Sequence, residues 1–169
     1  MCAEIAALEQ RRNVPAVLAF MRRQRDSGRA QAGCQVLCSL AVRGEHAALQ
    51  THPTAECVME VMAAHPKAVG VQEWALRLLC SLAAHSASDA AQIAAAGGIE
   101  RALAAMSALS SAAVHQWACE TLTRLSNYPI LAARIKSLGA EDSVKRAMAA
   151  PDATYSTKTS AKRLLAQLR

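Results

Sequence analysis

Aromatic residues are scarce in this sequence: its 169 residues include one phenylalanine, two tryptophans and two tyrosines. Glycine (7) and proline (5) are also few, whereas alanine (39) and leucine (18) are abundant. Strands favour aromatic and β-branched residues, whereas helices favour alanine and leucine. The composition therefore predicts an all-α protein and argues against a sheet-based fold.

Long apolar runs are absent as well, and no stretch approaches the roughly 20 apolar residues that a membrane span requires. The hydrophobic fraction of 53% and the modest net charge of +6 exclude an intrinsically disordered chain. A chain of this length can bury one core. We expect a single domain over residues 1–169 with no transmembrane segment.

Cysteine spacing gives no sign of a metal site or a disulfide framework. No Cys-x-x-Cys occurs, the histidines do not pair with cysteines at zinc-finger spacing, and all cysteines but Cys2 fall in apolar helical stretches. We expect reduced core thiols, no cofactor and a cytoplasmic protein. The arginines among the first 30 residues leave an organelle matrix as the alternative location, although Glu4, Glu9 and Asp26 interrupt them.

Catalytic motifs are missing too. The sequence has no glycine-rich phosphate loop, Gly-x-Ser-x-Gly or His-Glu-x-x-His. A Cys119 nucleophile with His115 one helical turn earlier is conceivable, but no carboxylate is placed to orient the histidine. We therefore expect a protein that is not an enzyme.

One helical sequence motif occurs four times, at residues 33–40, 75–82, 118–125 and 161–168. Each begins with a small residue followed by leucines four and seven positions later, which is the apolar stripe of a packed helix. The closing leucines, Leu40, Leu82, Leu125 and Leu168, are spaced 42, 43 and 43 residues apart. The preceding segments repeat as well, each ending in methionine (Met21, Met62, Met106 and Met148).

A shorter helix precedes each of these pairs, and glycines such as Gly97 and Gly139 are expected to end it. The predicted helices are 3–12, 14–26, 29–43, 45–51, 54–64, 68–84, 88–96, 98–109, 111–126, 129–138, 140–149 and 154–168. Ser88 or Asp89 is the expected cap of the helix at 88–96. Three-helix units of about 42 residues cannot bury their apolar faces alone, so they must stack into an α-solenoid.

The phrase from Ile93 to Met106, followed by Val114 to Leu125, closely resembles the armadillo repeat. The resemblance implies an armadillo-like right-handed superhelix of about four three-helix repeats, at approximately 1–43, 44–86, 87–127 and 128–169. In that family the long third helix of each repeat lines a concave surface. Importin alpha carries tryptophan and asparagine at two outward positions there, and their absence here argues against a receptor for nuclear localisation signals.

The outward positions of the third helices are the candidate partner-binding residues, because they lie opposite the leucine stripe. They are Gln35, Ser39, Arg77, Ser81, Glu120, Arg124, Arg163 and Gln167. Trp74 and Trp117 recur one repeat apart, each seven residues before an outward residue and one residue before a buried alanine. Two placements follow for these indoles: flanking the groove, or filling the seam between the second and third helices.

A basic patch formed by Arg22, Arg23, Arg25 and Arg29 is expected at the corner between the second and third helices of repeat one. It is either a solvated corner or a docking site for an acidic protein, a lipid headgroup or RNA. No aromatic residues for base stacking are interleaved with these arginines.

These features predict a noncatalytic scaffold or adaptor that binds another protein along its concave third helices. Thin polar coverage at the ends of the stack suggests self-association or membership of a larger complex. Two alternatives remain: a purely structural accessory subunit of a large multiprotein complex, and a nucleic-acid-binding solenoid that uses the basic surface.

Overall fold

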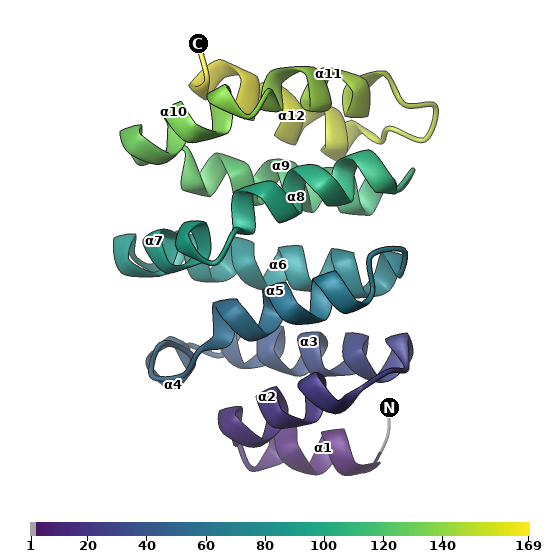
Figure 1. The fold of residues 1–169 in the computed structure, drawn as a ribbon, viewed down its shortest axis with the longest axis vertical. Helices are drawn as coiled ribbons and strands as arrows, with labels where there is room; N and C mark the ends of the chain where they lie inside the picture. The colour runs from purple at the N-terminus through teal and green to yellow at the C-terminus, as the bar shows by residue number, and fades with distance from the viewer. Residues whose placement is uncertain (1–2) are drawn as a thin grey trace.

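The computed structural model describes residues 3–169, with side chains from Ile5 onward, and this part of the chain contains helices and no strand. The twelve helices among these residues (Figure 1) are α1 (Ala3–Gln10), α2 (Val14–Arg23), α3 (Ser27–Val42), α4 (His46–Gln50), α5 (Thr54–Ala64), α6 (Val69–His85), α7 (Ala87–Ala95), α8 (Gly98–Ala108), α9 (Ala112–Leu125), α10 (Pro129–Ser137), α11 (Ala140–Ala149) and α12 (Tyr155–Gln167).

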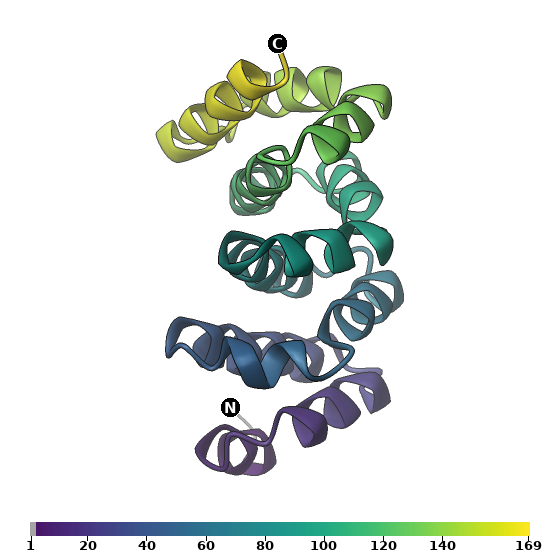
Figure 2. The same ribbon diagram turned by 90° about the vertical axis from the view of Figure 1, so that its left-hand side faces the viewer.

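The helices form successive triplets that stack along one axis (Figures 1 and 2). The longest helix of each triplet packs directly on the next, in the order α3, α6, α9 and α12. The second helices, α2, α5, α8 and α11, form a parallel layer on the other side of the stack. All helix pairs in substantial contact belong to the same or to adjacent triplets. The protein is therefore an α-solenoid, as the sequence repeats predict.

The core runs continuously between the two layers. The closing leucines of the third helices, Leu40, Leu82, Leu125 and Leu168, are all buried, with at most 4% of each residue exposed. Met21, Met62 and Met106 of the second helices are buried as well, and Met148 packs partly against the same core. The leucine stripe thus serves the packing role predicted from its spacing.

Helix boundaries follow local capping, and most differ from the sequence prediction by one to three residues, most of all at the junction of α2 and α3. The segment expected as one helix over 14–26 ends at Arg23, where the side chain of Gln24 donates to the Phe20 carbonyl (3.0 Å). Asp26 caps α3 by accepting from the Arg29 backbone N–H (2.8 Å), so Gly28 lies inside α3 instead of before it. Polar side chains at residues 24 and 26 move this boundary.

The start of α7 also corrects the prediction. Ser86, not Ser88 or Asp89, is the N-cap, and its hydroxyl accepts from the Asp89 backbone N–H (3.1 Å). Ser86 is fully extended (φ −152°, ψ 159°), so this single residue ends α6 and begins α7. The glycine stops behave as expected, because Gly97 (φ +86°) and Gly139 (φ +72°) adopt the left-handed conformation that favours glycine.

Side-chain hydrogen bonds fix the register between neighbouring triplets. The Thr121 hydroxyl donates to the Leu76 carbonyl (2.9 Å), and the Thr157 hydroxyl donates to the Ala112 carbonyl (3.1 Å). Within one triplet, the buried Gln72 amide donates to the carbonyls of Met62 (2.9 Å) and His65 (3.0 Å), and these bonds tie the end of α5 to α6.

In the part of the chain described, no helix is long and apolar enough to cross a membrane.

Candidate functional site

The third helices present a continuous row of polar and aromatic side chains, which we call the third-helix surface. Counting back from the closing leucine of each helix, the row occupies the positions one, five and eight residues earlier. Its members are Ser39 and Gln35 of α3; Ser81, Arg77 and Trp74 of α6; Arg124, Glu120 and Trp117 of α9; and Gln167, Arg163 and Ser160 of α12. Gln35 and Ser81 are half-buried members of the row.

Arg77 joins two repeats through the tryptophans. Its guanidinium carbon lies 4.7 Å from the ring centroid of Trp74, one turn earlier on α6, and 5.1 Å from that of Trp117 on α9. Both indoles are half-buried and pack partly against the core. They therefore combine features of the two expected placements: each flanks Arg77 on the third-helix surface while its inner part contributes to packing.

Two arginines of this surface lie close to cysteines of the preceding third helix. Burial raises the pKa of the Cys38 thiol of α3, and the nearby charge of Arg77 partly opposes this effect. Burial likewise raises the pKa of Cys80 on α6, against the charge and side-chain hydrogen bond of Arg124 on α9. Arg77 and Arg124 thus each reach back across one interface between neighbouring third helices.

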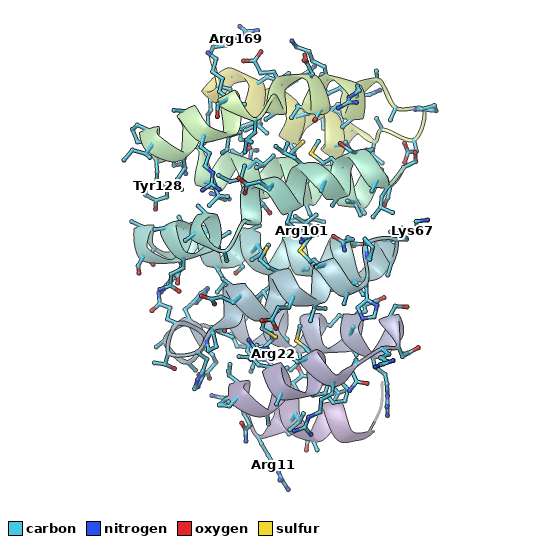
Figure 3. All side chains as sticks on the ribbon, viewed as in Figure 1. Arg11, Arg22, Lys67, Arg101, Tyr128 and Arg169 are labelled. Carbon is cyan, nitrogen blue, oxygen red and sulfur yellow. The ribbon has the colours of Figure 1, made fainter. Side chains whose placement is uncertain are left out.

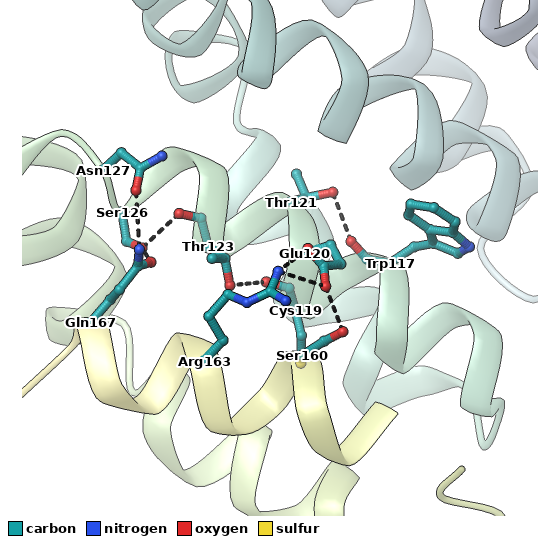
Figure 4. A network of polar contacts seen from close by, with 10 residues as sticks. All are labelled: Trp117, Cys119, Glu120, Thr121, Thr123, Ser126, Asn127, Ser160, Arg163 and Gln167. Carbon is teal, nitrogen blue, oxygen red and sulfur yellow. Dashed lines mark hydrogen bonds and ion pairs between the residues drawn. The ribbon is translucent and has the colours of Figure 1, made fainter. Parts of the chain in front are cut away.

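Glu120 and Arg163, which the sequence predicts as outward residues, are paired with each other between α9 and α12 (Figure 4). Arg163 Nη1 lies 3.2 Å from Glu120 Oε2, and the buried Ser160 hydroxyl donates to Glu120 Oε1 (2.6 Å). Only 15% of the Glu120 side chain is exposed. This carboxylate therefore fixes the α9–α12 interface instead of pointing freely outward.

The two ends of the row are also engaged in internal contacts. Gln167 accepts from the Ser126 hydroxyl (2.6 Å) and donates to the Asn127 side chain (3.1 Å), as Figure 4 shows. At the other end, the Ser39 hydroxyl donates to Glu9 Oε1 (2.9 Å), and Arg43 pairs with the same carboxylate (3.2 Å). The middle of the row, around Arg77 and Arg124, is the part with fewest polar contacts of its own.

The predicted basic patch lies at the corner between α2 and α3, with all four arginines exposed. Arg22 forms an ion pair with Glu60 of α5 (2.7 Å), on the side of the molecule seen in Figure 3. Arg23 belongs to α2, Arg25 lies in the connection, and Arg29 lies in the first turn of α3. The patch is therefore partly neutralised by the second repeat.

The cysteines have the environment of core residues. Cys34, Cys38, Cys57, Cys80 and Cys119 are buried and free, whereas Cys2 lies outside the described residues. Burial raises the pKa of Cys119 to about 12, so its thiol is neutral near pH 7. His115 does not bond Cys119; its Nε2 lies 3.2 Å from the Met106 carbonyl at the end of α8. Within residues 5–169 no group of three potential ligands could hold a metal ion.

Sequence reasoning missed the acidic partners that neutralise part of the surface. Glu9 lies on α1 of the first repeat, and its contact with Ser39 has no counterpart in the repeated motif. Ser160 could have been found, because it occupies the position at which α6 and α9 carry tryptophan. A small hydroxyl there leaves room for the carboxylate of Glu120 from the preceding repeat.

No family model matches the chain, and no curated protein matches its sequence. Solved structures do match. Two engineered proteins from a structural genomics consortium align with TM-scores of 0.82 and 0.79 at 16% and 17% identity, over 92% and 97% of this chain and 63% and 65% of theirs. A designed armadillo repeat protein aligns with a TM-score of 0.77 at 12% identity, over 90% of this chain and 63% of its own length.

The chain thus spans just under two thirds of the length of these structures. At such low identity the likeness concerns the fold alone. The stacked triplets, the continuous leucine core and these alignments agree, and together they show that this chain has an armadillo-like repeat fold.

Proposed function

We propose that this protein is a noncatalytic scaffold that binds a protein partner along its third-helix surface. The observation that carries the proposal is the cluster of Trp74, Arg77 and Trp117, which is half-buried and spans two repeats. Tryptophan and arginine are enriched among the residues that dominate binding energy at protein interfaces. Their mutual packing holds the three side chains in place before a partner arrives, which lowers the entropic cost of binding.

The chemistry of the cysteines supports a noncatalytic role. A nucleophilic cysteine needs a thiolate, and enzymes obtain one by lowering the thiol pKa. Burial does the opposite here, raising the pKa of Cys34 and Cys119 to about 12 and that of Cys57 to about 11. Free, buried thiols also fit the cytoplasmic location that we include in the proposal.

The test is affinity capture from an extract of cells that make the protein, followed by crosslinking and mass spectrometry. The informative variant is Arg77→Glu with Arg124→Glu; Arg163 is left unchanged because Glu120 already neutralises it. We expect the variant to lose the captured protein while its melting temperature stays within a few degrees of the wild type. Crosslinks should fall on α6 and α9.

A matched control reverses two charges elsewhere, with Arg23→Glu and Arg25→Glu in the basic patch. Loss of the partner only in this control would move the binding site to the patch. Retention of the partner in both variants, with crosslinks at the ends of the stack, would instead indicate the structural accessory subunit. Capture that depends on added nucleic acid and is lost in nuclease-treated extract would favour the nucleic-acid-binding alternative.

A further inference from the structure

We propose that Arg77 is the receptor for a carboxylate, and that the partner presents an acidic, extended segment of protein across α6 and α9. This inference rests on the proposed function, because it names the chemistry of the partner at the same surface. Trp74, Arg77 and Trp117 form the binding cluster, and Arg124 supplies a second positive charge on the neighbouring helix.

The first support is the way in which Arg77 is held. Its guanidinium contacts the rings of Trp74 and Trp117, and it makes no hydrogen bond to another side chain or carbonyl among the described residues. A guanidinium that stacks on aromatic faces keeps its in-plane N–H groups available. Those donors match the two oxygens of a carboxylate in a bidentate pair. The two indoles hold the Arg77 guanidinium in place and leave its in-plane N–H donors free to bind a partner.

The second support is the distribution of acidic partners. Glu120 is paired with Arg163, and Glu9 with Arg43. Neither Arg77 nor Arg124 forms an ion pair within residues 5–169, and Glu73, one turn before Arg77 on α6, forms none with it. The centre of the third-helix surface therefore carries two positive charges that the protein itself does not neutralise.

The half-buried position of Arg77 strengthens the ion pair that it could form with a partner. Arg77 is partly shielded from solvent by two indole rings, and an ion pair beside apolar surface is screened less than one in open water. Arg124 is exposed, so it contributes mainly to the attraction of an approaching acidic segment. We therefore expect most of the binding energy to depend on Arg77.

The spacing of the two arginines fits an extended peptide. Successive third helices run in the same direction (Figure 1), and packed helices lie about 8–10 Å apart. Arg124 stands one turn, about 6 Å, further along its helix than Arg77 does on α6. The two positions are thus roughly 11 Å apart, which an extended chain covers in three to four residues. Acidic residues four positions apart would face the surface together.

Protein is favoured over nucleic acid because the indoles are already occupied. Binding of single strands relies on aromatic rings on which bases stack and on long tracks of positive charge. Here both tryptophan rings lie against Arg77, and only two arginines of the surface lack an acidic partner. The cluster therefore suits a single carboxylate better than a strand of stacked bases with its long row of phosphates.

The test is fluorescence anisotropy at about 50 mM salt with a short labelled peptide in which glutamate alternates with alanine. The comparison peptide carries glutamine in place of each glutamate. We expect the wild-type protein to bind the glutamate peptide and Arg77→Gln to weaken binding about tenfold. Arg124→Gln should weaken it about two- to threefold, and Arg77→Lys should restore only part of the affinity, because lysine cannot form a bidentate pair.

The matched control is Arg23→Gln, which removes one charge from the basic patch on α2 and should change affinity less than twofold. Equal losses in Arg23→Gln and Arg77→Gln would overturn the proposal in favour of unspecific charge attraction. Equal binding of the two peptides, or no binding by the wild type, would also overturn it. Arg124→Gln, an exposed substitution, and Arg77→Lys keep the test valid if Arg77→Gln folds poorly.

Binding of a thymidine oligonucleotide to the same variants tests whether the partner is a nucleic acid instead of a protein. If it binds more tightly than the peptide and is lost in Arg77→Gln, the partner is a nucleic acid and the inference is wrong. If the peptide fails but affinity capture still depends on Arg77 and Arg124, only the acidic chemistry is rejected. If capture is independent of both residues, the proposed function itself falls.

Discussion

The guanidinium of Arg77 and the indole of Trp117 meet across a repeat boundary, with 5.1 Å between the guanidinium carbon and the ring centroid. Arg77 belongs to α6 and Trp117 to α9, so the contact links the second triplet of helices to the third. A cation over an aromatic face contributes about 0.5–2 kcal/mol, depending on its exposure. The Arg77–Trp117 pair therefore stabilises the interface between two repeats and also forms part of the proposed carboxylate-binding site.

This pair should show measurable coupling in a double-mutant cycle. We expect Arg77→Gln and Trp117→Leu each to lower the free energy of unfolding, and the double variant to lose about 0.5–1 kcal/mol less than their sum. Urea denaturation followed by circular dichroism measures all four proteins. Strictly additive losses would show that the contact contributes no interaction energy.

Much of the fold could be predicted from the sequence, because packing repeats with the period of the leucines. Leu40, Leu82 and Leu125 recur at nearly constant spacing, and a helix with this stripe must bury it. Boundaries were less predictable where a single polar side chain decides them. Ser86 caps α7 because its backbone is extended directly after α6. The acidic Asp89 three residues later gives Ser86 the spacing of a capping box, a signal that Ser88 lacks and that the prediction overlooked.

The candidate surface was harder to predict, since its contacts join different repeats. Helical phase places Arg163 opposite the leucines, but it does not reveal that Glu120 of the preceding repeat lies 3.2 Å from it. Trp117 sits between the inward and outward faces by phase alone. The Trp117 ring lies against Arg77, and the position of Arg77 relative to α9 follows only from the stacking of the two repeats.

Glu120 contacts both Ser160 and Arg163. We expect the buried Ser160 hydroxyl to contribute more to stability than the exposed Arg163 cation. Ser160→Ala should lower the free energy of unfolding by about 1 kcal/mol, because the buried Ser160 hydroxyl donates to Glu120 at 2.6 Å. Arg163→Gln should cost less, about 0.5 kcal/mol or below, because 52% of the Arg163 side chain is exposed. Chemical denaturation of both variants checks the order, and a reversed order would contradict it.

His115 should tolerate replacement by glutamine. It occupies the position that Gln72 has in the previous repeat, ten residues before the closing leucine. Gln72 donates to two carbonyls, whereas His115 bonds the Met106 carbonyl alone and its buried Nδ1 has no partner within the described residues. His115→Gln should raise the melting temperature by a few degrees. Calorimetry measures the shift, with His115→Ala as the destabilised comparison.

Alkaline pH should destabilise the protein through its buried thiols. An unfolded cysteine ionises near pH 9, whereas burial raises the pKa of Cys34 and Cys119 to about 12. The native state then binds more protons than the unfolded state, so stability is complete below about pH 9 and falls as the pH rises towards 12. At pH 10.5 the loss should be about 1–2 kcal/mol for each thiol.

The thiol contribution can be isolated with substitutions on the same helices. Cys34→Ala and Cys119→Ala should reduce the difference in unfolding free energy between pH 8 and pH 10.5, whatever their effect on absolute stability. Val36→Ala on α3 removes buried apolar volume without a titrating group, so it should keep the wild-type pH dependence. An unchanged pH dependence in both cysteine variants would refute the assignment.

The bonds from Thr121 to the Leu76 carbonyl and from Thr157 to the Ala112 carbonyl each tie one pair of adjacent repeats, and no substantial contact reaches further. A rotation of a few degrees at one such joint would swing distant helices through several ångströms yet leave every local distance nearly intact. A ligand that contacts only α6 and α9 spans a single joint between repeats. A ligand that extends from α3 to α12 spans three joints, so small rotations at each of them can adapt the surface to it.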